Sequence, residues 1–304
     1  MDRVNGRTSV VIPCYRDDRF LAAAIDSVCQ QTKKAREIIV VDDGSPVPLS
    51  KIEPISGQSL VWVRTDNRGL GAARNRGISE ASGEFVAFLD ADDIWLPEKI
   101  QLQEQLLDRC PEAVACYTHC VDEPGFFKFG PYPRGDLPRG LLAHLLWHGQ
   151  FYPPSSLMVR KHVMDQLKGF REGLANGEDL DLNFRLLKKG EILGCTEPLL
   201  KYRVHDGQIT RSSVKKILGQ KVARQHIIKE CADVLREAGI EPGQHWDAYR
   251  EKVVNVFYRR HFSEARPMLW DYWKDHPRDW RVLLYTIATF APPRWVSAMR
   301  GEIS

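Results

Sequence analysis

The stretch EFVAFLDADD, residues Glu84–Asp93, places three carboxylates directly after a short run of apolar residues. The run Phe85–Leu89 has the length and composition of a strand that is buried on both faces. Like charges this close repel each other and are costly to bury, so a positive partner is expected beside them. Alternate side chains point the same way at a strand end, so Asp90 and Asp92 can converge on one point. The stretch therefore predicts a buried strand with an acidic site at its carboxyl end.

Three further apolar runs precede this strand, and helical patterns separate them. They are TSVVIP (Thr8–Pro13), EIIVVD (Glu37–Asp42) and LVWVRT (Leu60–Thr65). We expect Asp17 and Asp18 to cap the first helix. The alternation predicts an α/β fold with a parallel sheet and helices on both faces.

Polar clusters follow each predicted strand, where open α/β sheets bind their ligands. The clusters are Cys14–Arg16, Asp42–Ser45, Asp66–Arg68 and Asp90–Asp93. Two converging carboxylates suit a hard divalent cation, Mg²⁺ or Mn²⁺. The competing interpretation is a capped turn before a helix that starts near Pro97. Asp93, on the opposite side of the strand, could bind a ribose hydroxyl or hold the following loop.

The composition excludes several classes of protein. The 304 residues carry 43 Lys+Arg against 40 Asp+Glu, which is too even for nucleic-acid binding. The N-terminus shows no signal peptide, and the longest apolar run near the C-terminus, Val282–Ala291, is too short to span a bilayer. Seven scattered cysteines without a CxxC pair indicate neither disulfides nor zinc. We therefore expect a cytoplasmic protein.

The chain divides into a catalytic region, residues 1–213, and a helical C-terminal extension, residues 214–304. Within the first, Gly125–Pro154 reads as a long loop that could cover the site. The extension holds 16 Lys+Arg, 11 Asp+Glu and five tryptophans, Trp246, Trp270, Trp273, Trp280 and Trp295. Two interpretations stay open: a helical bundle with a tryptophan core, or peripheral contact with the inner face of a membrane. Membrane contact would use Trp280, Trp295, Arg281, Arg294 and Arg300.

Several motifs in one order resemble the family 2 glycosyltransferases of GT-A fold, from about Thr8 to Ser213. They are SVVIPCY (Ser9–Tyr15), VVDDGS (Val40–Ser45), NRGLGAARNRGI (Asn67–Ile78), ASGEFVAFLDADD (Ala81–Asp93), SSLMVRK with a downstream GF (Gly169, Phe170), NGEDLDLNFRL (Asn176–Leu186) and YRVH (Tyr202–His205). The resemblance implies a GT-A-type α/β fold with a mixed, mostly parallel sheet and helices on both faces. It also implies a metal-assisted, inverting enzyme that takes a sugar from a nucleoside diphosphate sugar. The acceptor would be a hydroxyl of a glycan or a lipid-linked saccharide.

The resemblance also implies residues for the donor. Asp42 or Asp43 would accept a hydrogen bond from the base, as a carboxylate does from N3–H of uracil or thymine. Pro13 would shape the loop beneath that base, and Tyr15 belongs to the same donor-binding set. Arg74 would meet the diphosphate together with the N-terminus of its helix, the alternative being a surface salt bridge.

For the metal and the chemistry, the resemblance implies Asp90, Asp92 and His205 around the cation. Asp179 would be the general base that takes the proton of the acceptor hydroxyl, and Glu178 would contact the acceptor or the donor sugar. Acidic residues also stabilise helix N-termini, which is the competing interpretation of Glu178 and Asp179. For His205 the alternative is a structural histidine.

Two departures from the family pattern lie near the base: Arg16 follows Tyr15, and Pro46 follows Ser45. A UDP-linked donor is favoured, with thymidine and guanosine left open. GLGAAR (Gly69–Arg74) nearly matches a dinucleotide fingerprint, but Arg74 takes the place of its third glycine, so an oxidoreductase is the weaker alternative. A nucleotide-sugar-binding module without catalysis is the other.

Overall fold

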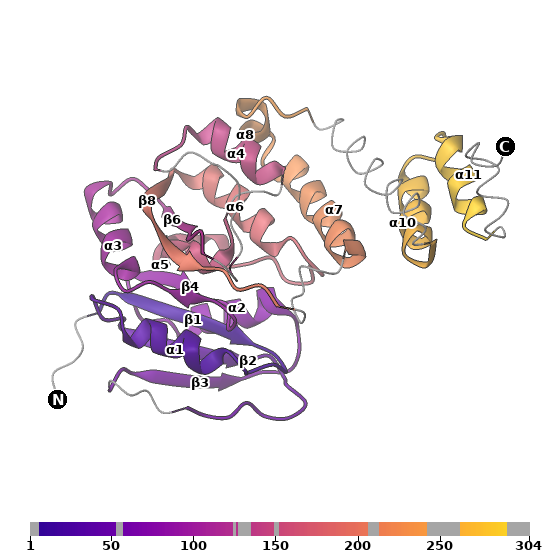
Figure 1. The fold of residues 1–304 in the computed structure, drawn as a ribbon. Helices are drawn as coiled ribbons and strands as arrows, with labels where there is room; N and C mark the ends of the chain where they lie inside the picture. Colours follow the sequence, from indigo (N-terminus) through magenta and orange to yellow (C-terminus); the bar gives the residue numbers. More distant parts are fainter. Residues whose placement is uncertain are drawn as a thin grey trace.

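The computed structural model describes residues 6–52, 57–123, 126, 135–148, 152–205, 213–241 and 262–290. Its centre is an eight-stranded mixed sheet with the order β3-β2-β1-β4-β7-β6-β8-β5 (Figure 1). The strands are β1 (Thr8–Cys14), β2 (Glu37–Asp42), β3 (Leu60–Arg64), β4 (Phe85–Phe88), β5 (Ile94–Trp95), β6 (Ala115–Cys120), β7 (Met158–Arg160) and β8 (Ile192–Lys201). Strands β3, β2, β1 and β4 are mutually parallel, so their carboxyl ends share one edge, as predicted.

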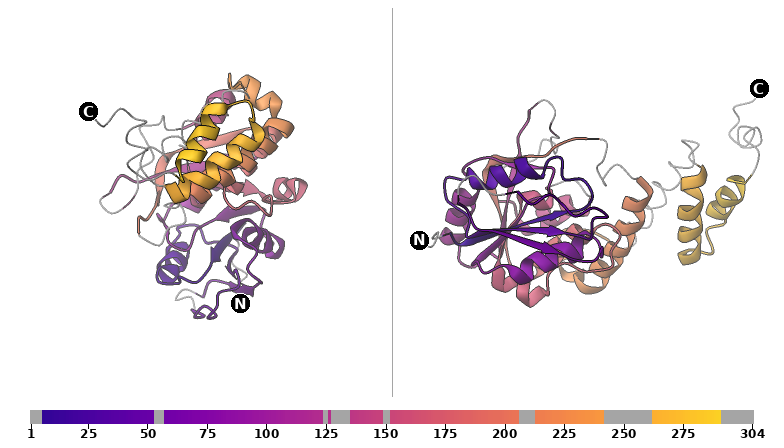
Figure 2. Two further views of the ribbon diagram at one scale, coloured as in Figure 1. Left: turned by 90° about the vertical axis from the view of Figure 1, so that its right-hand side faces the viewer. Right: turned by 90° about the horizontal axis from the view of Figure 1, so that it is seen from below.

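Helices cover both faces of this sheet (Figure 2). The described helices are α1 (Leu21–Cys29), α2 (Leu70–Glu80), α3 (Lys99–Arg109), α4 (Arg139–Trp147), α5 (Lys161–Leu167), α6 (Glu178–Lys189), α7 (Ser213–Glu230), α8 (Ala232–Glu237), α10 (Phe262–Asp275) and α11 (Trp280–Ala288), with a 3₁₀ turn at Pro154–Ser156. Helices α10 and α11 lie apart from the sheet (Figure 1). Alternation along the strands sorts the core into two layers, because successive side chains point to opposite faces. Val10 and Ile12 of β1 pack with α1 and α3, whereas Val11 packs with α2 and α6.

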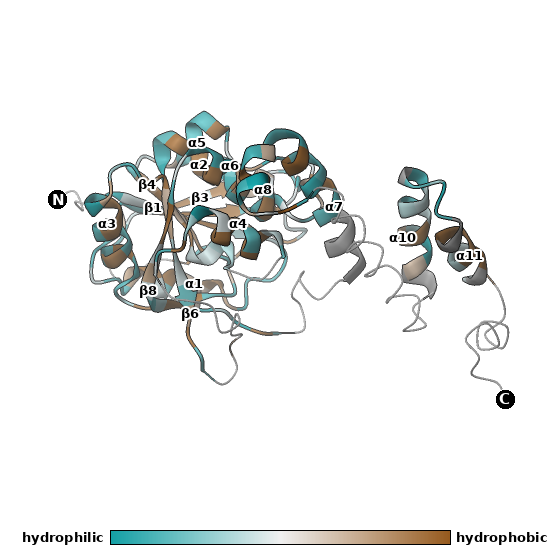
Figure 3. Ribbon diagram, turned by 90° about the horizontal axis from the view of Figure 1, so that it is seen from above, coloured by the Kyte–Doolittle hydropathy of each residue, from teal (hydrophilic) through white to brown (hydrophobic). Residues whose placement is uncertain are grey.

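The hydropathy of the elements follows this layering (Figure 3). The strands of the centre are almost continuously apolar, as expected of strands covered on both faces. The covering helices are amphipathic, and α6 buries Leu180, Phe184 and Leu187 on the side that faces the sheet.

Three local expectations are corrected. Helix α1 begins at Leu21 without a side-chain cap, because Asp17 instead pairs with Arg19, at 2.5 Å. The expected loop Gly125–Pro154 contains a helix, α4, whose Leu142 and Trp147 are buried; residues 127–134 and 149–151 lie outside the described part. The sequence around Glu191–Thr196 and Leu199–Val204 predicts two strands, whereas the structure has one continuous strand, β8.

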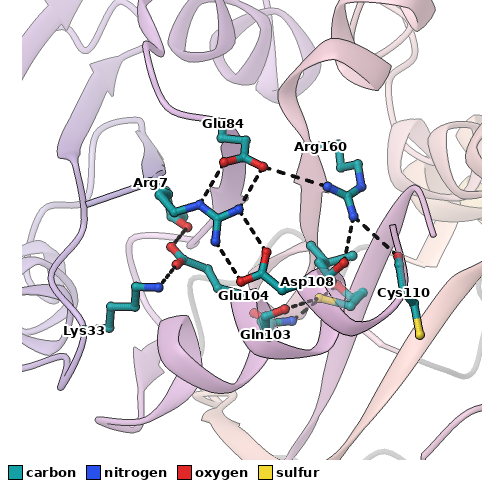
Figure 4. A network of polar contacts seen from close by, with 11 residues as sticks. Arg7, Lys33, Glu84, Gln103, Glu104, Asp108, Cys110 and Arg160 are labelled. Atoms are coloured by element: carbon teal, nitrogen blue, oxygen red, sulfur yellow. Dashed lines mark hydrogen bonds and ion pairs between the residues drawn. The ribbon is translucent and has the colours of Figure 1, made fainter. Parts of the chain in front are cut away.

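At the amino ends of β1 and β4, an ion-pair network ties the sheet to α3 (Figure 4). The guanidinium of Arg7 binds Glu84 and Asp108, each at 2.8 Å. Glu104 is fully buried, accepts from the Thr8 hydroxyl at 2.6 Å, and pairs with Lys33 at 2.5 Å. This network lies at the edge opposite the carboxyl ends, so it supports the fold away from the acidic cluster.

The chain after Ser213 is helical wherever the structure describes it. Helices α7 and α8 pack against α6 and α4, and their Ile227, Val234 and Leu235 join the core. Helix α10 contacts α7 through Lys221 and Asp271, 2.5 Å apart. Among the described helices, none has the length and apolar character needed to cross a membrane.

Candidate active site

The turn after β4 holds the three aspartates, and each has a different environment. Ser155 organises the turn: its hydroxyl donates to Asp93 at 2.6 Å and accepts from the backbone N–H of Asp90 at 3.0 Å. Asp93 also accepts from the backbone N–H of Arg203 at 3.1 Å. Burial raises the pKa of Asp93 well above its usual value, and the charges of Asp92 and Asp90 add to the effect. Asp93 therefore holds the loops together, which is the second of its two expected roles.

Arg74 joins this turn to the acidic start of α6. Its guanidinium donates to Asp90 at 2.7 Å and to Glu178 at 2.9 Å. The residue is 1% exposed, so it is not a surface salt bridge. It also lies in the second turn of α2, one turn further from the N-terminus than expected. Asp90 and Glu178 are 88 positions apart in the sequence, and the guanidinium of Arg74 brings their carboxylates to one site.

Glu178 and Asp179 are the first two residues of α6, after Gly177 in a left-handed conformation with φ 90°. Burial raises the pKa of Glu178, the charge of Asp179 adds to this, and Arg74 opposes it. Asp179 is only partly buried, and its Oδ1 accepts from the N–H of Leu180 at 2.7 Å. The geometry thus offers one buried carboxyl held by arginine and one carboxylate with access to solvent.

Asp92 lies beside His205, with 2.9 Å between Oδ2 and Nε2. The backbone of the same turn is held by Arg203, whose Nε donates to the Asp92 carbonyl at 2.9 Å. The Arg203 guanidinium lies over the Phe20 ring, 4.4 Å from its centroid, and Phe20 also contacts the His205 ring at 5.1 Å. The YRVH segment therefore packs directly on the acidic turn, across 113 positions of sequence.

The side chains around the acidic turn can be compared with the ligands that a divalent cation needs. Within the residues that the structure describes, no three His, Cys, Asp or Glu side chains form a preassembled metal site. Burial raises the pKa of Asp92, the charge of Asp90 adds to this, and His205 opposes it. Mg²⁺ and Mn²⁺ are commonly held by one or two carboxylates and completed by phosphate oxygens. The residues fit a cation shared with a substrate, and do not fit a site made by protein alone.

At the end of β2, Asp42 and Asp43 already have partners. Asp42 accepts from the Ser45 N–H at 2.8 Å and from Arg64 at 3.0 Å. Asp43 accepts from the N–H groups of Arg68 and Gly69, both at 3.0 Å, at the start of α2. Both side chains are buried, and both shape the loops at the carboxyl edge of the sheet.

Pro13 and Tyr15 flank the same edge. Pro13 pairs with Val41 inside the sheet, and Tyr15 is 37% exposed with the Arg16 guanidinium 4.8 Å from its ring centroid. Arg16 has φ 66°, a left-handed conformation that is uncommon for a residue with a side chain. Its N–H donates to the Ser45 hydroxyl at 2.9 Å, which ties the loop after β1 to the loop after β2.

Reasoning from sequence missed two residues of this site. Ser155 opens the SSLMVRK motif and Arg203 lies in YRVH, but the sequence gives neither residue a role at the acidic turn. Their contacts depend on the fold, because their partners in the turn lie more than 60 positions away.

Comparison with known proteins points to one family. Residues 9–167 match the family described as "Glycosyl transferase family 2". An uncharacterized glycosyltransferase of Nostoc sp. is 40% identical over 276 residues, which cover 84% of this chain and 81% of the relative. The amylovoran biosynthesis glycosyltransferase AmsB of Erwinia amylovora is 28% identical over 210 residues, 64% of this chain and 69% of the relative.

Two solved structures share the fold. S. aureus TarS 1–349 in complex with UDP-GlcNAc has a TM-score of 0.60 at 17% identity and covers 76% of this chain and 70% of its own. The mannosyltransferase PcManGT from Pyrobaculum calidifontis, in complex with GDP-Man and Mn²⁺, has a TM-score of 0.58 at 13% identity and covers 97% of this chain and 79% of its own. These matches favour a glycosyltransferase over a dinucleotide-binding oxidoreductase. The chain belongs to glycosyltransferase family 2 and has the GT-A fold.

Proposed function

We propose that this enzyme transfers a sugar from a nucleoside diphosphate sugar, with UDP favoured, to a hydroxyl of a glycan or lipid-linked saccharide. The anomeric centre is inverted. The observation that carries the proposal is the Arg74 bridge from Asp90 to Glu178, at 2.7 and 2.9 Å. It gathers the carboxylates proposed for the donor and those proposed for the acceptor at one edge of the sheet.

The donor is proposed from the neighbours and from the loops at the carboxyl ends. TarS has been solved with UDP-GlcNAc and PcManGT with GDP-Man. In this chain the base would lie against the loops of Pro13, Tyr15, Asp42 and Asp43. Arg64 lies in the same place, since it binds Asp42 at 3.0 Å and donates to the Ser45 carbonyl at 2.7 Å. A carboxylate and a guanidinium side by side suit uracil or thymine, which offers an N3–H donor between two carbonyl acceptors.

Asp92, Asp90 and His205 would hold Mn²⁺ or Mg²⁺, and the phosphates of the donor would complete its coordination. When bound, such an ion offsets the charge that develops on the departing diphosphate. Arg74 keeps Asp90 in place for this role, and its direct contact with the diphosphate stays a prediction.

Asp179 acts as the general base in the proposed reaction. It is the solvent-accessible carboxylate of the pair, and it can accept the proton of the acceptor hydroxyl as that oxygen attacks the anomeric carbon. The nucleoside diphosphate leaves from the opposite face in the same step. Glu178, fixed by Arg74, contacts the acceptor or the donor sugar and orients it against Asp179.

The experiment that tests this function compares Asp179→Asn with wild type. A screen of UDP- and GDP-sugars by thermal shift with Mn²⁺ selects the donor, and release of nucleoside diphosphate from it then gives the rate. We expect Asp179→Asn to lose at least about 100-fold in kcat, with donor binding retained. Glu172→Gln is the matched control, because Glu172 is an exposed carboxylate of the same region that pairs with Arg68 and accepts from Asn75.

Wild-type rates in Asp179→Asn would contradict its role as base. Binding of a nucleotide sugar by the wild type, without release of nucleotide under any condition, would favour the non-catalytic binding module.

Peripheral membrane contact is proposed for the α10–α11 pair. An apolar groove of about 520 Å³ lies between these helices, lined by Pro267, Trp270, Leu283, Ile287 and Phe290 with Arg266 and Thr286. Trp270 and Phe290 are 47% and 67% exposed. Of the five residues expected at a membrane, Trp295, Arg294 and Arg300 lie outside the described residues, and the side chains of Trp280 and Arg281 are also outside them. Flotation with anionic liposomes is expected, and its loss in Phe290→Asp would assign the contact to this groove.

A further inference from the structure

Helix α7 lies directly against the loop that presents the two acidic residues of α6. A β-carbon on Gly219 would lie 2.5 Å from Cβ, N and O of Asn176, which no real side chain could tolerate. A β-carbon on Gly177 would lie 3.0 Å from Cβ of Ala223 and 3.3 Å from Cα of Gln220. Residues 219–223 of α7 thus pack directly on residues 176–177, and the contact leaves no room for a side chain at Gly219.

The contacted loop leads straight into the candidate active site. Gly177 is the N-cap of α6, and Glu178 and Asp179 follow it. Glu178 is in turn bonded to Arg74, and Arg74 to Asp90. A shift of the loop by a few tenths of an ångström would therefore move Asp179 relative to the donor-side carboxylates. A misplacement of about 1 Å that is caused by a distant mutation can cost an enzyme about 100-fold in rate.

The other end of α7 is tied to the same helix. Glu230 accepts from Arg171 at 2.7 Å, and Arg171 also donates to the buried Asp181 of α6 at 3.0 Å. Lys188, near the end of α6, donates to the Glu230 carbonyl. Arg224, between the two ends, donates to the Trp147 carbonyl at 2.7 Å, and the Trp147 ring packs edge-on against Phe184 of α6. Helix α7 is therefore held in register along the whole of α6.

We propose that α7 positions the catalytic acidic pair, and that Gly219 is the positioning residue through which it does so. The inference rests on the proposed role of Asp179 and adds to it a dependence on the segment after Ser213. Gly219 touches no substrate. Because Gly219 has no side chain, the backbone of α7 contacts the Asn176–Glu178 loop directly and sets its position. The position of this loop in turn sets the distance from Asp179 to the acceptor hydroxyl.

Gly219→Ala is the direct test, and Gly140→Ala is its matched control. Gly140 lies in α4, where an added β-carbon would meet the Glu237 carbonyl oxygen at 2.7 Å, a comparable clash at another contact with the C-terminal helices. Both substitutions raise helix propensity by about 1 kcal/mol, so this contribution cancels in the comparison. The measurements are release of nucleoside diphosphate from the donor selected above, the Kd of UDP with Mn²⁺, and amide exchange at Asp181 and Leu182.

For Gly219→Ala we expect at least a tenfold loss of kcat, a UDP Kd within twofold of wild type, and at least tenfold faster exchange at Asp181 and Leu182. For Gly140→Ala we expect wild-type kcat and wild-type exchange in α6. Glu230→Ala removes the ion pair with Arg171 without a clash and leaves the Lys188 bond to the Glu230 carbonyl in place, so we expect about a threefold lower kcat at unchanged Tm. Equal losses in Gly219→Ala and Gly140→Ala, or wild-type rates in Gly219→Ala and Glu230→Ala, would overturn the inference. If Asp179→Asn is fully active while Gly219→Ala shows faster exchange in α6, the proposed base is wrong and the positioning by α7 stands.

Discussion

Arg74 is the residue on which the geometry of the site depends most. It is buried at 1% exposure with carboxylates on two sides, and burial alone would lower its pKa, so Asp90 and Glu178 must supply the compensation that keeps it charged. A buried ion pair is costly to break, because removing one partner leaves the other charge without compensation. The same contact could not be predicted from the sequence, since Arg74 and Glu178 are 104 positions apart and each has an ordinary local explanation.

Arg74→Met is expected to lower the free energy of unfolding by about 3–5 kcal/mol, as for other broken buried pairs. Arg74→Lys should lose less stability, but it should still impair transfer, because an ammonium cannot hold two carboxylates in the fork geometry of arginine. Urea denaturation measures the stability. Arg76→Met is the control on the same helix: its pair with Glu80 is exposed, so a change within about 0.5 kcal/mol is expected. An equal loss in both variants would contradict the account of Arg74.

The buried side chain of Lys99 should make the free energy of unfolding depend on pH. Burial lowers its pKa to about 7 in the folded protein, where the ammonium lies 3.9 Å from the Trp95 ring centroid and bonds Gln103 at 2.6 Å. Between pH 7 and about 10.4, the unfolded chain keeps this proton and the folded protein has lost it, so the contribution of Lys99 to stability rises with pH. The unfolding free energy of wild type relative to Lys99→Met should increase by about 1.4 kcal/mol per pH unit between pH 7.5 and 8.5. A difference that does not change with pH would contradict this assignment.

At the scale of elements, what the sequence predicts well is local. The strands β1 to β4 were recognisable from unbroken apolar runs, and the acidic turn from the position of its aspartates after β4. Helix α4 was missed because Pro and Gly surround it, although Leu142 and Trp147 are buried. Helix α1 starts later than expected, because Asp17 forms an ion pair with Arg19 instead of capping the N-terminus of the helix. The contact of His205 with Asp92 could be expected only from the resemblance to the family 2 glycosyltransferases, because local patterns carry no information on residues 113 positions apart.

The Arg7 network gives an element-scale prediction that is separate from catalysis. Arg7→Ala removes two bidentate contacts, one with Glu84 beside β4 and one with Asp108 of α3. Both pairs are partly exposed, so we expect a loss of about 1–2 kcal/mol in the free energy of unfolding. High salt should reduce this difference, because exposed charges are screened. Urea denaturation at low and high NaCl checks both statements. Since the network lies at the amino ends of the strands, kcat should be unchanged, and a change in kcat would show a coupling that the contacts do not explain.

At the scale of the whole molecule, α7 and α8 complete the core of the α/β part, while α10 and α11 meet it through α7. Ile227, Val234 and Leu235 are almost fully buried against the cluster that includes α4 and α6. A chain ending at Glu241 should therefore keep its Tm within a few degrees and retain transfer. A chain ending at residue 212 should lose cooperative unfolding, because it exposes that apolar surface. Thermal melts followed by circular dichroism decide between them, and an equally stable shorter chain would instead support the proposed boundary near residue 213.

The most direct test of the account is calorimetric titration of UDP into wild type and Asp92→Asn, each with Mn²⁺ and with EDTA. If the aspartates of the β4 turn hold a cation that bridges to the diphosphate, wild type binds UDP at least tenfold more tightly with Mn²⁺ than with EDTA, and Asp92→Asn loses this difference. Equal UDP affinity with Mn²⁺ and EDTA in wild type, or an unchanged metal dependence in Asp92→Asn, would contradict it.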